Sequence, residues 1–342
     1  MISRRTFLAS AALAPVMMPR LGFAQRAKMK LSHYLPPMHQ MHGWLTAWAS
    51  DLREKSSGEI DIEIFPASQM GPPPRQYDMV RTGVADIGLF FPTFTPGRFP
   101  LTDVHLMSFA YAKPDTLKPI LASDASEIAT RLFDHYAATF EGTKPLLAAV
   151  TPGGGFFMRD KMIAKPADLA GLRLRPPGPI VASYVEAWGG ANAMFPPAEV
   201  GDAISKGTID GAVFSFEAAR AFQLGVAVKK VSLLPASTGI FVLTMNQGVY
   251  DGLSPASRQL IDGTTGPAAA RTIGGLYADA EVAGRKYMEG AGAEIVDIEL
   301  EQAKEFKSIT DGVMEKALED MEGKGIPARA LNTALRKMVA DA

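Results

Sequence analysis

The sequence has 342 residues and no cysteine, which excludes disulfide bonds, thiolate nucleophiles and zinc sites built on cysteine. It also has almost no net charge, since 35 basic and 36 acidic residues leave a formal value of −1. This balance gives no electrostatic reason to expect a nucleic acid or an anionic membrane as partner. Beyond residue 24 no apolar run is long enough to span a bilayer, so we expect a soluble mature chain.

Familiar catalytic motifs are absent as well. The sequence has no HExxH, no GxSxG and no phosphate-binding loop, and the glycines at 153–155 do not form a GxGxxG fingerprint. His39 and His42 flank a predicted helix start with no third ligand nearby, so we interpret them as capping or solvent-facing residues. We therefore predict a protein that is not an enzyme and that carries no metal or cofactor.

Residues 1–24 have the pattern of a cleaved signal peptide. Arg4 and Arg5 precede an apolar stretch over residues 7–18, and small residues at 22 and 24 mark a cleavage site. The paired arginines in Ser-Arg-Arg-Thr-Phe-Leu resemble a twin-arginine export signal, and a general secretory signal is the alternative. Either signal predicts export to the periplasm of a Gram-negative bacterium.

The rest of the chain alternates predicted strands and helices, which indicates an α/β fold. Because its length exceeds what one hydrophobic core usually spans, we predict two lobes, each a sheet flanked by helices. Strands are predicted at 28–33, 59–65, 85–91, 171–175 and 208–215. Helices are predicted at 42–55, 75–83, 179–188, 198–206, 254–287, 302–322 and 327–339. The long helical stretch near the C-terminus is suited to bridge the two lobes.

Phenylalanines cluster at the ends of three predicted strands. In open α/β sheets ligands bind beyond the carboxyl ends of the strands, so the pattern favours an aromatic cleft. The alternative is that each of these side chains belongs to the core. The residues concerned are Phe90, Phe91, Phe94, Phe156, Phe157, Phe214 and Phe216.

Arg173 and Arg175 alternate with leucines on a short strand that Pro176 and Pro177 end. Residues two apart on a strand point to the same face, so both arginines share one side. A guanidinium fork matches a carboxylate, and two ordinary surface charges are the alternative. The pattern alone does not choose between these interpretations.

From residue 28 onward the chain resembles the periplasmic solute-binding proteins of TRAP (tripartite ATP-independent periplasmic) transporters, the DctP-like family. This resemblance implies that the protein captures an organic acid between two closing lobes and delivers it to a sodium-driven membrane permease. It also implies the boundaries of the lobes: residues 27–152 with about 240–280, and residues 153–239 with about 281–342. The matching stretches lie at 31–71, 81–90, 165–178, 195–211 and 253–262.

The resemblance assigns the carboxylate to Arg175, the last residue of the GLRLR motif, and leaves Arg173 exposed. Three polar contact positions of sialic-acid-binding members correspond here to Gly155, Phe91 and Phe214. A site that loses such contacts no longer favours hydroxylated ligands. We therefore predict a monocarboxylate with an apolar or aromatic body, such as a 2-oxo or 2-hydroxy acid.

Further contacts are predicted from the strand ends around the cleft. Phe94 and Phe156 join the aromatic lining, and Tyr34 and His33 supply polar contacts. Arg98 and Glu217 lie near the same strand ends, where each would either face the ligand or support a residue that does. The alternatives are a C4-dicarboxylate or sugar-acid binder of the same family, a receptor for a sensor kinase, and an exported α/β enzyme. We expect a monomer.

Overall fold

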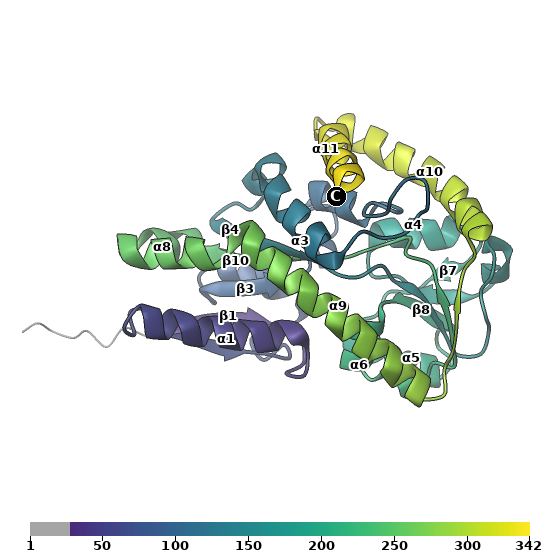
Figure 1. Ribbon diagram of the computed structural model, residues 1–342, viewed down its shortest axis with the longest axis horizontal. Coiled ribbons are helices and arrows are strands. Elements are labelled where there is room, and N and C mark those ends of the chain that lie inside the picture. The colour runs from purple at the N-terminus through teal and green to yellow at the C-terminus, as the bar shows by residue number, and fades with distance from the viewer. Residues whose placement is uncertain (1–27) are drawn as a thin grey trace, which may run out of the picture.

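A computed structural model describes residues 28–342 and shows two mixed sheets flanked by helices (Figure 1). The predicted signal peptide lies outside the described residues. The first sheet has the strand order β2-β1-β3-β10-β4, and the second has the order β11-β9-β5-β8-β6-β7. The predicted two-lobed α/β fold is confirmed.

The first sheet combines a parallel and an antiparallel half. β1 (Met29–His33) pairs in parallel with β2 (Ile62–Phe65) and β3 (Ile87–Phe90). β10 (Ile240–Asn246) runs antiparallel between β3 and β4 (Thr143–Val150). The helices in this part of the chain are α1 (Gln40–Lys55), α2 (Gln76–Arg81), α3 (Ala122–Arg131) and α7 (Gln247–Asp251).

The second sheet is built around one reversed strand. β5 (Gly155–Met158) runs antiparallel to both β8 (Gly211–Phe214) and β9 (Lys230–Leu233). β6 (Arg173–Arg175) lies in parallel between β8 and β7 (Ala191–Asn192), and β11 (Glu294–Asp297) pairs in parallel with β9. The short helices of this part are α4 (Pro179–Ala187), α5 (Val200–Ser205) and α6 (Phe216–Ala221).

The predicted helix over 254–287 is two helices, α8 (Pro255–Thr264) and α9 (Gly266–Gly290). Thr265 has an extended backbone, and Gly266 has a φ of +79°, which favours glycine. Pro267 follows and starts the next helix without needing an amide donor. The last two helices are α10 (Leu300–Glu322) and α11 (Ala328–Asp341).

Helix α9 runs diagonally across both lobes (Figure 1). It packs against α3 of the first lobe and against α6 of the second. Two glycines allow these close approaches. A Cβ at Gly274 would lie 2.2 Å from the Ala122 carbonyl oxygen, and one at Gly284 would lie 2.1 Å from that of Phe216. Glycine at these positions lets one helix brace both lobes at backbone contact distance.

One hydrophobic core continues from lobe to lobe. It contains Phe90 and Phe140 next to the first sheet, and Phe156 and Trp188 next to the second. Helix α10 packs on α4, whereas α11 packs on α3 and on the 3-10 segment Pro100–Leu106. The proposed lobe boundaries stay a prediction.

The chain passes between the sheets three times: after β4, before β10, and along α9. Two of these crossings are joined by hydrogen bonds from the Thr151 amide to the Gly239 carbonyl (2.9 Å) and from the Gly239 amide to the Thr151 hydroxyl (2.7 Å). A third bond, from the Gly154 amide to the Ser237 carbonyl (3.1 Å), extends the connection. These hydrogen-bonded segments connect the two lobes at the base of the space between them.

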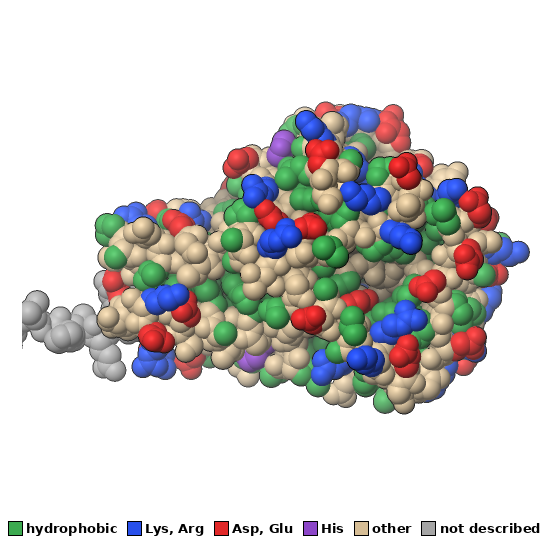
Figure 2. All heavy atoms as spheres, in the orientation of Figure 1, with side chains coloured by type: hydrophobic (Ala, Val, Ile, Leu, Met, Phe, Trp, Pro, Cys, Tyr) green, Lys and Arg blue, Asp and Glu red, His purple; other side chains and the backbone are tan. Residues whose placement is uncertain are grey.

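Acidic and basic side chains are interspersed on the face shown in Figure 2. This mixture agrees with the near-zero net charge. None of the helices described over residues 28–342 is long and apolar enough to cross a membrane.

Candidate functional site

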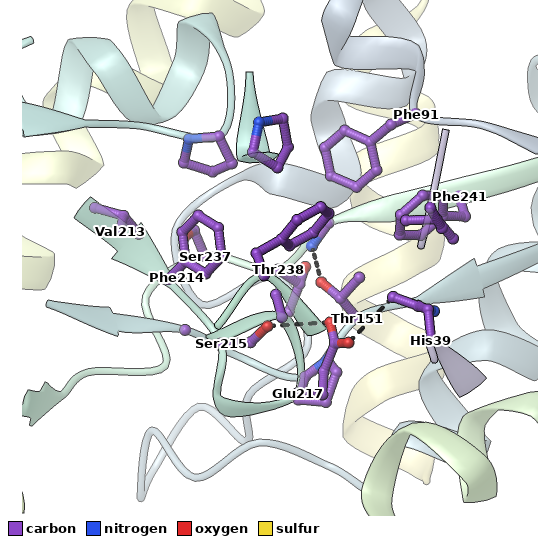
Figure 3. A pocket seen from close by; sticks show the side chains of 18 of the residues that line it. His39, Phe91, Thr151, Val213, Phe214, Ser215, Glu217, Ser237, Thr238 and Phe241 are labelled. Carbon is purple, nitrogen blue, oxygen red and sulfur yellow. Dashed lines mark hydrogen bonds and ion pairs between the residues drawn. The ribbon is translucent and has the colours of Figure 1, made fainter. Parts of the chain in front are cut away.

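A pocket lies where the strand ends of both sheets meet the crossing segments (Figure 3). The cavity itself has a volume of about 90 Å³, and it opens into a larger space of about 610 Å³ that includes solvent. Its walls come from the loop between β1 and α1, the turn after β3, the end of β6, the β8–α6 corner and the two crossings.

Arg175 is the one Lys or Arg side chain among the described residues that line this pocket. It ends β6 and is only 3 % exposed, because the strand stops at the meeting edge of the lobes. Its Nε donates to the Phe195 carbonyl at 3.0 Å, and its guanidinium carbon lies 5.3 Å from the centre of the Phe214 ring. Burial lowers the pKa of Arg175 to about 10, so the group stays charged at neutral pH.

This buried cation has no anionic partner in residues 28–342, where none of the ion pairs involves Arg175. Within the same residues its two terminal nitrogens donate no hydrogen bond. A buried charge without a counterion is costly, and a ligand carboxylate would remove that cost. The geometry is therefore suited to an anion inside the pocket.

Aromatic rings form much of the remaining wall. Tyr34, Phe91, Phe94 and Phe214 line the pocket, as the sequence predicted, and Phe241 at the start of β10 joins them. The ring centres of Phe91 and Phe241 are 4.9 Å apart, and those of Tyr34 and Phe94 are 5.5 Å apart. Such edge and tilted contacts produce a rigid apolar surface suited to a flat ring.

Glu217 supplies the negative charge of the pocket. Its carboxylate accepts hydrogen bonds from Ser215 Oγ (3.1 Å) and Gln40 Nε2 (2.9 Å), and it lies 3.3 Å from His39 Nε2 (Figure 3). Burial alone raises the pKa of Glu217, but these partners outweigh burial and hold the pKa below its usual value. Because Gln40 and His39 begin α1 while Glu217 begins α6, the contact also joins the two lobes.

Helix α9 contacts the start of α6, next to Glu217. Glu281 of α9 accepts hydrogen bonds from the backbone amides of Phe216 (3.1 Å) and Glu217 (2.9 Å) at the start of α6. Burial raises the pKa of Glu281 to about 8. The carboxyl group thereby caps a helix start that has no side-chain cap of its own.

Phe156 and His33, two of the predicted contact residues, do not line the pocket. Phe156 packs against Trp188 and Phe306, with ring centres 5.7 Å and 5.6 Å away. It lies inside β5, which runs opposite to its neighbours, so the pocket meets the chain before this strand, at Gly154. His33 turns away, and its Nε2 lies 3.1 Å from His42 Nδ1.

Arg98 is also placed elsewhere. Its guanidinium pairs with Asp78 at 2.8 Å and lies over the ring of Tyr77. Arg173 is exposed, as expected, and forms an ion pair with Asp210. These two arginines therefore stabilise the surface of the fold.

His39 caps α1, as the sequence suggested, but it is buried rather than solvent-facing. Its Nδ1 accepts a hydrogen bond from the Met41 amide, and the residue is 2 % exposed beside Glu217.

Within residues 28–342 no cluster of three His, Cys, Asp or Glu side chains is able to hold a metal. Further lining residues that the sequence did not predict include Thr151, Phe222, Ser237, Thr238 and Phe241.

Residues 31–320 match the family model described as bacterial extracellular solute-binding protein, family 7. A curated solute-binding protein of Albidiferax ferrireducens is 25 % identical over 277 residues, which cover 76 % of this chain and 78 % of the relative.

Two solved structures are similar over 92 % of this chain and 98 % of theirs. One is a marine-metagenome TRAP solute-binding protein specific for aromatic acid ligands, in complex with metahydroxyphenylacetate, with a TM-score of 0.86 and 27 % identity. The other is a TRAP solute-binding protein from Rhodoferax ferrireducens in complex with copurified benzoate, with a TM-score of 0.85 and 29 % identity.

Proposed function

Because the chain belongs to bacterial extracellular solute-binding protein family 7, the family of TRAP transporter solute-binding proteins, we propose that its pocket captures an organic monocarboxylate with an aromatic body. It is a binding protein and not an enzyme. Members of this family bind small organic acids and work with membrane permease subunits.

The observation that carries the proposal is the buried, unpaired guanidinium of Arg175 inside an aromatic pocket. A single cation calls for a single carboxylate, and a guanidinium binds a carboxylate through two parallel hydrogen bonds. The rings of Phe91, Phe214 and Phe241 offer apolar surface to the rest of the ligand. A similar preference for aromatic acids is stated for the marine-metagenome structure.

Screening the purified mature protein against a small ligand set tests this assignment. Benzoate, mandelate and phenylpyruvate represent aromatic monocarboxylates, while succinate and galacturonate represent the dicarboxylate and sugar-acid alternatives. We expect the aromatic acids to raise the melting temperature, because a ligand that binds only the folded state stabilises it. Stabilisation by succinate or galacturonate alone would refute the proposal.

Replacing the anchor tests the site directly. We expect Arg175→Ala to weaken binding of the best aromatic acid at least about 100-fold, because it leaves a carboxylate without its counterion. The matched control is Arg173→Ala, two residues earlier on the same strand, where the side chain is exposed and already paired with Asp210. Isothermal titration calorimetry gives both affinities. Equal affinities for Arg175→Ala and wild type would remove Arg175 from the site.

We also infer that residues 1–24 direct export and that the mature protein delivers its ligand as a monomer to a sodium-driven permease. Ligand uptake by cells that carry or lack the gene distinguishes transport from a sensing role. Sedimentation of the purified chain measures its oligomeric state.

A further inference from the structure

The carboxylate of Glu217 lines the same pocket as Arg175, and the proposed function assigns it no contact with the ligand. Among the described lining residues these two are the only members of the Arg, Lys, Asp and Glu group. Tyr34 lies within electrostatic reach of both charges. A ligand held by Arg175 therefore occupies a pocket that also contains one fixed negative charge.

The partners of Glu217 leave limited acceptor capacity. Within residues 28–342, Oε2 faces Gln40 and His39, whereas Oε1 accepts only the Ser215 hydroxyl. A carboxylate offers about four lone-pair positions, so Oε1 is able to accept one more donor. The side chain is 2 % exposed, and a ligand in the pocket is therefore the available source of that donor.

We propose that Glu217 is a specificity-determining residue that rejects a second carboxylate on the ligand and accepts a neutral hydroxyl or amide donor there. This inference rests on the proposed function, because it concerns the part of the monocarboxylate that Arg175 does not hold. A second carboxylate would find no second Lys or Arg among the described lining residues, and it would meet a like charge. Like charges placed together in a buried interface repel one another and weaken binding.

A series of benzoates that differ only at the meta position tests the inference on the wild-type protein. Benzoate reports whether the pocket takes an aromatic acid at all. 3-Carbamoylbenzoate and isophthalate have nearly the same shape, but only isophthalate carries a second charge. By calorimetry at pH 7.5 we expect the carbamoyl compound to bind at least about 100-fold more tightly than isophthalate.

The variant Glu217→Gln keeps the shape of the side chain and removes its charge. We expect it to reduce the preference for the carbamoyl compound to less than about tenfold. The matched control is Glu305→Gln, which removes the same charge from an exposed position on α10 and should leave the preference unchanged. Circular dichroism verifies that each variant is folded, and the wild-type series alone decides the matter if Glu217→Gln does not fold.

The outcomes separate the two claims. Absence of benzoate binding overturns the proposed function together with this inference. Benzoate binding with equal affinities for the two meta compounds overturns the inference alone. Benzoate binding with no binding of either meta compound also overturns it, because space rather than charge then excludes them.

Discussion

Arg173 and Arg175 lie two residues apart on β6 and have opposite environments. Arg173 is exposed and paired with Asp210, whereas Arg175 is buried at the point where the strand meets the other lobe. The alternation of Arg and Leu predicted the strand and the shared face. It did not predict the burial, because burial depends on which lobe covers the strand end.

His33 was predicted to contact the ligand, but it is buried beside His42, and its burial affects the stability of the fold. Burial first, and then the nearby His42 and His39, lower the pKa of His33 to about 3. An unfolded histidine titrates near 6.5, so below that pH the unfolded state binds the additional proton. The free energy of unfolding therefore decreases as the pH falls from about 6.5 towards 3.

We expect His33→Gln to remove this contribution, which amounts to at most about 1.4 kcal/mol per pH unit. Urea unfolding at pH 7.5, 6.0 and 4.5 should show a shallower loss of stability in the variant than in wild type. His135→Gln, at an exposed histidine, is the control. Identical pH dependence in His33→Gln and wild type would contradict the assignment.

The direction of each strand explains which phenylalanines of the pocket were predicted from the sequence and which were not. Phe91 follows β3 and Phe214 ends β8, and each of these strands has a parallel neighbour in its own sheet, so position along the strand was informative. Phe156 and Phe241 belong to strands of reversed direction, and the pattern of one strand does not reveal its direction relative to others. The reversal turned Phe156 into a core residue and brought Phe241 to the pocket.

At the scale of secondary structure elements, α9 connects the lobes through glycine contacts. We expect Gly284→Ala to lower the free energy of unfolding by about 1–3 kcal/mol, because its Cβ would meet the backbone of Phe216. Gly275→Ala is the matched control, since a Cβ there meets nothing within 4 Å. Alanine at an open helical position should stabilise the protein by about 0.5–1 kcal/mol. If chemical denaturation shows that both substitutions change the free energy of unfolding in the same direction, the tight contact at Gly284 is contradicted.

Helices and strands with a clear period were predictable, and their connections were not. The apolar spacing in α1 predicted its end correctly and its start within two residues, whereas β2 begins three residues later than the alternation predicted. The prediction of one helix over 254–287 overlooks Pro267, which is unfavourable inside a helix and favoured in its first turn. β10 is a continuous buried run, and its place between β3 and β4 follows from long-range pairing.

For the whole molecule, the continuous core and the bridging helix predict cooperative unfolding. Each sheet has a buried cluster of its own, but a third cluster contains side chains from both lobes, so unfolding one lobe would expose part of the interior of the other. We expect a single calorimetric transition in the free protein. Benzoate at 100 times its Kd should raise the free energy of unfolding by about 2.7 kcal/mol and should shift the whole transition. Two transitions, of which benzoate moves one, would indicate lobes that unfold independently.

The strand order has a consequence for biosynthesis. β10 separates β3 from β4, and β11 completes the second sheet only at residues 294–297. A nascent chain that has emerged as far as residue 239 therefore has unpaired strand edges in both halves. Domains usually fold as units during translation, but here neither unit is complete until most of the polypeptide has left the ribosome.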